Sequence, residues 1–155
     1  MPIETVVLAV GEDTGERAER LEQVTAEAAG ATGARVVVVH VFDEETFAEA
    51  ASAPHATADP TPAELVLEYG PVQDVMATLD AEGIPYEVRG AVGDPGTEVV
   101  RIAREVDAER IVVGGRRRTP AGKATFGSTA QAILLSAPCP VTVSLDGTPP
   151  AGGSP

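Results

Sequence analysis

Three short and almost continuous apolar runs constrain the fold of this chain most strongly: TVVLAV at residues 5–10, RVVVVHVF at 35–42 and RIVV at 110–113. Runs without polar alternation are typical of strands that are buried on both faces of a sheet. Two weaker segments, residues 86–92 and 141–145, complete a set of five predicted strands. Strands buried in this way are parallel, and parallel strands need long crossover connections, usually helices.

The segments between the strands have the expected helical periodicity. Residues 43–62 are acidic and rich in Ala, and they contain Pro, so we predict a loop with at most one helical turn there. Residues 65–67 fit a helix or a strand equally well. The alternation predicts an open α/β fold, a five-stranded parallel sheet with helices on both faces. The residues that recur at helical spacing are Ala18, Leu21, Thr25 and Ala28, then Val72, Val75, Met76 and Leu79, then Val99, Ile102, Ala103 and Val106, and finally Ala130, Ile133, Leu134 and Ala137.

The chain has 155 residues, the size of one domain, and 43% of them are hydrophobic. That fraction is too high for a disordered chain, and with 3% aromatic residues the core must be aliphatic. We assign residues 1–145 to one domain and expect the Pro/Gly-rich residues 146–155 to be disordered. No apolar run approaches the ~18 residues of a membrane helix, and no basic targeting segment precedes the first strand. We therefore expect a cytoplasmic protein that does not bind membranes.

The net charge of −13 makes the surface strongly acidic. Such a surface repels nucleic acid and anionic membranes, so neither is an expected partner. Lys123 is the sole lysine among eleven basic residues. A lysine-poor acidic surface favours a halophilic protein from a high-salt cytoplasm, where screening weakens self-repulsion. A GC-rich genome would also favour Arg over Lys.

One short segment nevertheless concentrates positive charge. Residues 116–123 follow Gly114 at the end of a predicted strand, and Gly127 opens the next predicted helix. Free N–H groups at a helix start bind anions such as phosphate, and arginine adds bidentate donors. A solvated loop whose arginines pair with nearby carboxylates is the alternative. The basic residues are Arg116, Arg117, Arg118 and Lys123.

The pattern in this segment differs from the Walker sequence and from the dinucleotide fingerprint, which weakens both classes. Ser128 and Gln131 have the spacing of a capping box, which predicts Ser128 as the N-cap of this helix.

The stretch at residues 111–144, IVVGGRRRTPAGKATFGSTAQAILLSAPCPVTVS, is similar to the C-terminal signature of the universal stress protein family. VVLAV near the start, VVVVHV in the second strand and GDP at 93–95 fit the family in the same order, so the resemblance covers about residues 3–145. It implies a parallel sheet of strand order 3-2-1-4-5 with four helices, in agreement with the periodicity.

Many members of that family bind ATP through a G-x2-G-x9-G-[S/T] loop. Gly114 fits the first glycine, and Gly127 with Ser128 fits the last pair. The resemblance therefore implies a stress-response regulatory module that binds ATP or another adenine nucleotide, with Mg²⁺ accompanying the phosphates. The residues it implies for nucleotide binding are Gly11, Asp13, Val41, Gly114, Arg116, Arg117, Lys123, Gly127, Ser128 and Thr129.

Two of these positions depart from the family's pattern. Arg117 stands at the second glycine of the loop, and Gly11 stands where binders tend to carry Asp. Both departures favour an alternative, an interaction module of the same fold that is dimeric and binds no nucleotide. Slow ATP hydrolysis is a further alternative, but no residue is a persuasive base to orient water, so we expect no enzyme.

The last predicted strand runs from Val141 to Leu145 and should lie at an edge of the sheet. Exposed edges are usually covered or paired. The resemblance implies a homodimer through this strand, paired antiparallel with its two-fold mate. A short edge shielded by residues 146–155 is the alternative. The sequence does not identify a regulatory partner.

The remaining chemically interesting residues have ordinary explanations. His40 lies in an apolar strand, so we predict a packed, hydrogen-bonded imidazole. We predict that the His55 side chain is solvated. We predict that Cys139 is a buried, inert thiol. Because it is the single cysteine, an internal disulfide is excluded. Residues 43–45 could hold Mg²⁺ through carboxylates, but a solvated acidic surface is the simpler reading.

Overall fold

The apolar runs form one sheet. The computed structural model describes residues 3–11, 16–54, 56, 58–114 and 127–144. The strands β1 (Thr5–Ala9), β2 (Arg35–Phe42), β3 (Tyr86–Val92), β4 (Arg110–Gly114) and β5 (Val141–Ser144) are parallel, in the order β3-β2-β1-β4-β5. Both the fold class and the strand order that the resemblance implied are confirmed.

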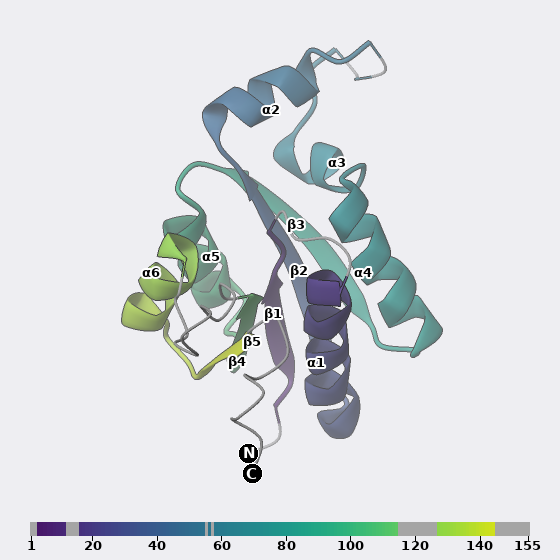
Figure 1. Ribbon diagram of the computed structural model, residues 1–155, viewed down its shortest axis with the longest axis vertical. Coiled ribbons are helices and arrows are strands. Elements are labelled where there is room, and N and C mark those ends of the chain that lie inside the picture. Colours follow the sequence, from purple (N-terminus) through teal and green to yellow (C-terminus); the bar gives the residue numbers. More distant parts are fainter. Residues whose placement is uncertain (1–2, 12–15, 55, 57, 115–126, 145–155) are drawn as a thin grey trace, which may run out of the picture.

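Two pairs of helices cover the sheet. Helices α1 (Glu16–Thr32) and α4 (Gly70–Ala81) lie on one face, and α5 (Pro95–Glu105) and α6 (Ser128–Ser136) lie on the other (Figure 1). Two further helices, α2 (Glu44–Ala51) and α3 (Pro62–Val66), follow the end of β2 at the top of Figure 1. Among the helices that the structure describes, none has the length and apolar character needed to cross a membrane.

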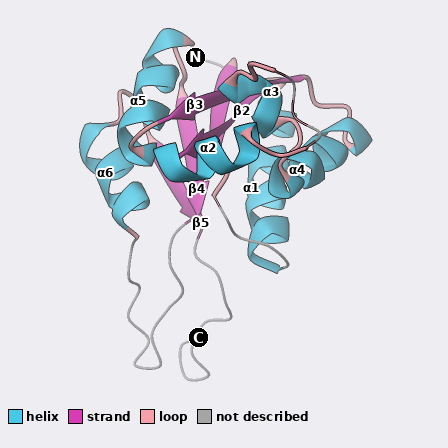
Figure 2. Ribbon diagram, turned by 90° about the horizontal axis from the view of Figure 1, so that it is seen from above, coloured by secondary structure: helices cyan, strands magenta, loops and turns pink. Residues whose placement is uncertain are grey.

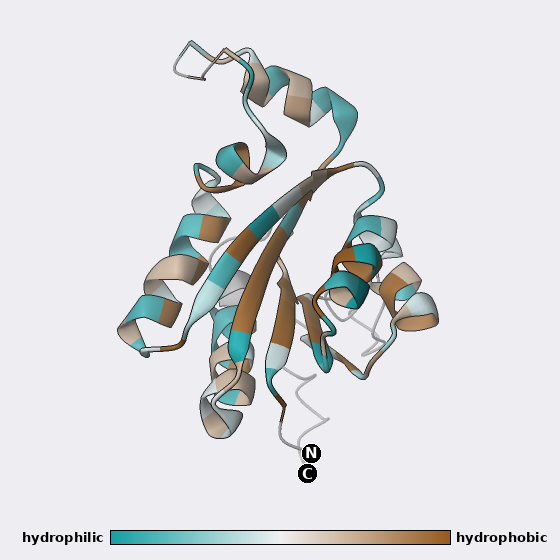
Figure 3. Ribbon diagram, turned by 180° about the vertical axis from the view of Figure 1, so that it is seen from behind, coloured by the Kyte–Doolittle hydropathy of each residue, from teal (hydrophilic) through white to brown (hydrophobic). Residues whose placement is uncertain are grey.

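The core has two halves, one on each side of the sheet. Alternate residues of β1 serve each half: Val6 and Leu8 pack with α1 and α4, whereas Val7 and Ala9 pack with α5 and α6. Figure 3 shows the central strands as the most hydrophobic part of the molecule. Burial on both faces explains why β1 and β2 carry no polar alternation.

The prediction of a loop at residues 43–62 is wrong, because a helix of eight residues, α2, lies within it. The Asp43 carboxylate caps α2 by accepting the Thr46 N–H at 2.6 Å, and this hydrogen bond lowers the pKa of Asp43. No residue of α2 is fully buried, so the helix lacks the apolar stripe by which periodicity finds helices. Of the ambiguous residues 65–67, the first two belong to α3 and Leu67 is its C-cap. The first residue of this helix is Pro62, which suits a helix start.

The predicted start of the last helix at Gly127 and Ser128 is confirmed, since α6 begins at Ser128, but the predicted N-cap needs correction. Gly127, not Ser128, is the N-cap of α6, and no side chain caps this helix. The capping-box spacing of Ser128 and Gln131 is therefore coincidental. By contrast, the GDP turn begins a helix as predicted, since the Asp94 carboxylate accepts the Thr97 N–H at 2.9 Å and caps α5.

Candidate nucleotide-binding edge

The chain reverses its winding direction between β1 and β4. After β1 the chain adds β2 and β3 on one side, and then crosses to β4 and β5 on the other. In open α/β sheets, ligands bind outside the carboxyl ends of the strands at such a switch point. Figure 2 looks onto this edge, with α5 and α6 on one side and α1 and α4 on the other.

The register brings the ends of β1 and β4 together. Ala9 of β1 pairs with Val113 of β4, so Gly11, which follows β1, and Gly114, the last residue of β4, both lie at this edge. Gly11 is exposed, and a Cβ at this position would meet no atom within 4 Å. The space in front of Gly11 is therefore open among the described residues.

Val41 buries its side chain in the core, and its peptide groups face the space beyond the end of β1. Its side chain is 8% exposed and packs in the half of the core under α5 and α6. The Val10 N–H donates to the Val39 carbonyl at 2.8 Å, so the peptide groups of Val39 face β1. Because strand peptides alternate sides, those of Val41 face the same way, beyond the last residue of β1.

Helix α6 points its amino end at the same edge. The helix leads through residues 137–140 into the amino end of β5, so its own start lies toward the carboxyl ends of the strands. The first-turn N–H groups, including those of Ser128 and Thr129, have no partner within a helix. Gly127 has φ −68° and ψ 163°, a conformation open to any residue, so the backbone does not require glycine there.

The position of α6 is fixed by close packing on α5. A Cβ on Gly96 of α5 would lie 2.6 Å from the Cβ of Ala132 and 3.6 Å from the Thr129 carbonyl oxygen. The glycine thus lets the two helices approach closely. This contact sets where the first turn of α6 stands.

The fold gathers six of the predicted residues at the carboxyl edge, and binding by them stays a prediction. These six are Gly11, Val41, Gly114, Gly127, Ser128 and Thr129. The other four, Asp13, Arg116, Arg117 and Lys123, lie outside the described residues, as do His55 and residues 146–155.

His40 is the packed imidazole that the sequence predicts. It is 7% exposed, its Nδ1 lies 2.7 Å from the Val10 carbonyl oxygen, and Phe42 contacts it edge-on. The sequence did not point to Tyr69, which lies just before α4. Its ring stacks on His40, and its hydroxyl donates to the Gly11 carbonyl at 3.2 Å. Because Tyr69 and Gly11 are 58 residues apart in the chain, no local sequence pattern indicates this contact.

The chemistry of the remaining candidates is ordinary. Cys139 is partly rather than fully buried, and burial raises the pKa of its thiol, which favours the unreactive form. Within the described ranges, no group of three His, Cys, Asp or Glu side chains could hold a metal ion.

Comparison with known sequences gives the family. The family model described as the universal stress protein family matches residues 3–144. A curated universal stress protein of Mycolicibacterium smegmatis is 47% identical over 73 residues, which are 46% of this chain and 56% of that protein. The match therefore spans little more than half the length of this curated relative.

Solved structures agree in fold over almost the whole chain. A universal stress protein from Archaeoglobus fulgidus is 31% identical with a TM-score of 0.66, covering 90% of this chain and 97% of that one. The universal stress protein from the same archaeon in complex with dAMP is 26% identical with a TM-score of 0.62, covering 92% and 98%. The strand order, the switch-point edge and the family match over residues 3–144 lead to one conclusion: this chain belongs to the universal stress protein family.

Proposed function

We propose that this protein is a stress-response regulatory module that binds ATP or another adenine nucleotide at the carboxyl edge of β1 and β4. The observation that carries the proposal is the convergence of Gly11, Gly114 and the start of α6 at the switch point. The dAMP complex of the relative from Archaeoglobus fulgidus supports the choice of an adenine nucleotide.

The phosphates would lie against the start of α6. Its first-turn N–H groups and partial positive charge favour an anion, and the Ser128 and Thr129 hydroxyls can donate as well. Gly114 and Gly127 leave room for phosphate oxygens near the backbone. Arg116, Arg117 and Lys123 supply positive charge on sequence grounds, and Mg²⁺ would accompany the polyphosphate.

The adenosine would lie toward β1 and β2. Val41 offers its peptide groups, and the open space at Gly11 admits a ring or a ribose. Asp13 follows two residues later and would contact the adenosine on sequence grounds. The nucleotide in this proposal is a regulatory ligand, and no reaction is assigned to it.

The proposed assembly is a cytoplasmic homodimer through β5. This strand lies at an edge of the sheet, as predicted, and its four residues are all partly exposed. Among the described residues, no strand pairs with the outer side of β5, and an exposed strand edge favours pairing with a second copy.

Titration calorimetry with ATP and Mg²⁺ in molar KCl tests the function, comparing wild type with Arg117→Gly. We expect wild type to bind ATP and Arg117→Gly to bind it more weakly, because the variant lacks the guanidinium group that we expect to contact the phosphates. A wild type that gives no heat, beside a variant that binds, would mean that Arg117 blocks the loop. If neither protein gives binding heat and the dimer is stable, the proposal fails in favour of an interaction module of the same fold that binds no nucleotide.

A further inference from the structure

Two stacked rings hold the end of β1. The ring centroids of Tyr69 and His40 are 4.1 Å apart, and their planes differ by 22°. His40 Nδ1 donates to the Val10 carbonyl at 2.7 Å, and Tyr69 Oη donates to the Gly11 carbonyl at 3.2 Å. Two consecutive carbonyls directly after β1 are thus fixed by side chains from elsewhere in the chain.

Tyr69 is itself held in place through its main chain and its ring. The Tyr69 N–H donates to the Val66 carbonyl of α3 at 3.0 Å. Its carbonyl accepts the N–H groups of Val72 and Gln73 in α4, both at 3.0 Å. The His40 ring beneath it is buried and meets Phe42 at 4.8 Å with an interplanar angle of 89°. The position of the hydroxyl is therefore set by α3, α4 and β2 together.

From this geometry we propose that Tyr69 is a positioning residue for nucleotide binding, which holds Gly11 at the adenosine end of the site without touching the ligand. The inference rests on the proposed function, since it adds a residue to that same edge. It also explains how a glycine with open space around it can offer a fixed surface. Without the hydroxyl, Gly11 must be ordered at the moment of binding, which costs affinity.

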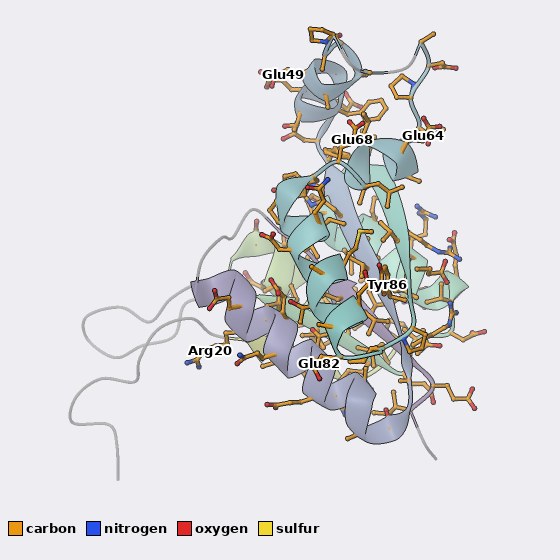
Figure 4. All side chains as sticks on the ribbon, turned by 90° about the vertical axis from the view of Figure 1, so that its right-hand side faces the viewer. Arg20, Glu49, Glu64, Glu68, Glu82 and Tyr86 are labelled. Atoms are coloured by element: carbon orange, nitrogen blue, oxygen red, sulfur yellow. The ribbon has the colours of Figure 1, made fainter. Side chains whose placement is uncertain are left out.

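The experiment uses the chain's two tyrosines as a matched pair. Tyr69→Phe removes the hydroxyl and keeps the ring on His40. Tyr86→Phe makes the same change at the first residue of β3, where the hydroxyl donates to Asp80 Oδ2 at 3.1 Å. Figure 4 shows Tyr86 far from Glu68, the neighbour of Tyr69 in sequence. Both hydroxyl contacts are exposed, and Tyr86 donates to a carboxylate whereas Tyr69 donates to a neutral carbonyl, so Tyr86→Phe should lose at least as much stability as Tyr69→Phe.

We expect Tyr69→Phe to bind ATP about fivefold more weakly, the usual worth of one neutral hydrogen bond. Tyr86→Phe should bind as wild type does. In nucleotide-free protein, the Val10 amide donates to the Val39 carbonyl and reports the order of this segment. Its hydrogen exchange should speed up about fivefold in Tyr69→Phe alone.

Each other outcome overturns the inference in a recognisable way. If wild type binds ATP and Tyr69→Phe binds equally well, Tyr69 does not position the site, although the proposed function stands. Faster exchange with unchanged affinity would show that the contact is merely structural. If wild type binds no nucleotide, the proposed function fails first, and the role of Tyr69 fails with it.

Discussion

Gly90→Ala should lower the free energy of unfolding by about 2 kcal/mol, within the range of overpacked sites. Gly90 lies in β3 opposite His40, and α3 crosses directly over it. A Cβ there would lie 2.5 Å from the Pro62 carbonyl oxygen and 2.6 Å from Val66 Cγ2. A backbone oxygen cannot move aside as a side chain can, so α3 must lift from the sheet. For a domain of this size, the melting temperature should fall by about 4–8 °C.

Gly30→Ala is the matched control for this substitution. Gly30 is exposed in α1, and a Cβ there would meet no atom within 4 Å. Alanine in a helix interior is more stable than glycine by about 0.5–1 kcal/mol. The same added methyl group should therefore raise the melting temperature at residue 30 and lower it at residue 90. A rise at both positions, measured by calorimetry or circular dichroism, would contradict the close contact of α3 with β3.

Gly127→Asp should weaken ATP binding about a hundredfold while leaving the fold as stable as before. Aspartate is a better N-cap than glycine, and the φ and ψ of Gly127 suit it, so α6 should not lose stability. The new carboxylate would stand where the proposal puts the phosphates. Two unit charges about 4 Å apart repel by about 4 kcal/mol at an effective dielectric constant of about 20. A loss of ~1.4 kcal/mol is already tenfold in affinity.

Gly127→Asn separates charge from size in this experiment. Asparagine caps helices as well as aspartate does and has almost the same shape. Titrations in about 0.1 M KCl keep the Debye length near 10 Å, so the charge is still felt. We expect Asn to cost at most about tenfold, well short of the loss with Asp. Equal affinities for the two variants would mean that no phosphate lies near the start of α6.

The sheet could be predicted from the sequence because its strands are buried on both faces. Such strands consist of almost continuous apolar runs, and residues 5–10 and 35–42 show this pattern clearly. Helix α2 could not be predicted, because Phe47, Ala50 and Ala51 are its contacts with the core and none of them is fully buried. Periodicity detects burial, so a helix that buries little escapes it.

The candidate site was predictable in part for a similar reason. Glycines and hydroxyl residues at a strand end and a helix start follow each other closely in sequence, so Gly114, Gly127 and Ser128 form a local pattern. Tyr69 acts through stacking on His40 and through a hydrogen bond to Gly11, both across long sequence separations. The N-cap of α6 was misassigned because Ser128 fits the capping-box spacing, although Gly127 is the N-cap and Ser128 is the first residue of the helix.

Nuclear magnetic resonance of the ¹⁵N-labelled protein, titrated with ATP and Mg²⁺, tests nucleotide binding at this edge most directly. The account predicts that amide signals move for Gly11, Val41, Gly114, Gly127, Ser128 and Thr129. Signals at the opposite edge, such as those of Glu109 and Arg110 at the start of β4, should stay in place. Spectra that do not change with ATP, or shifts confined to that opposite edge, would contradict it.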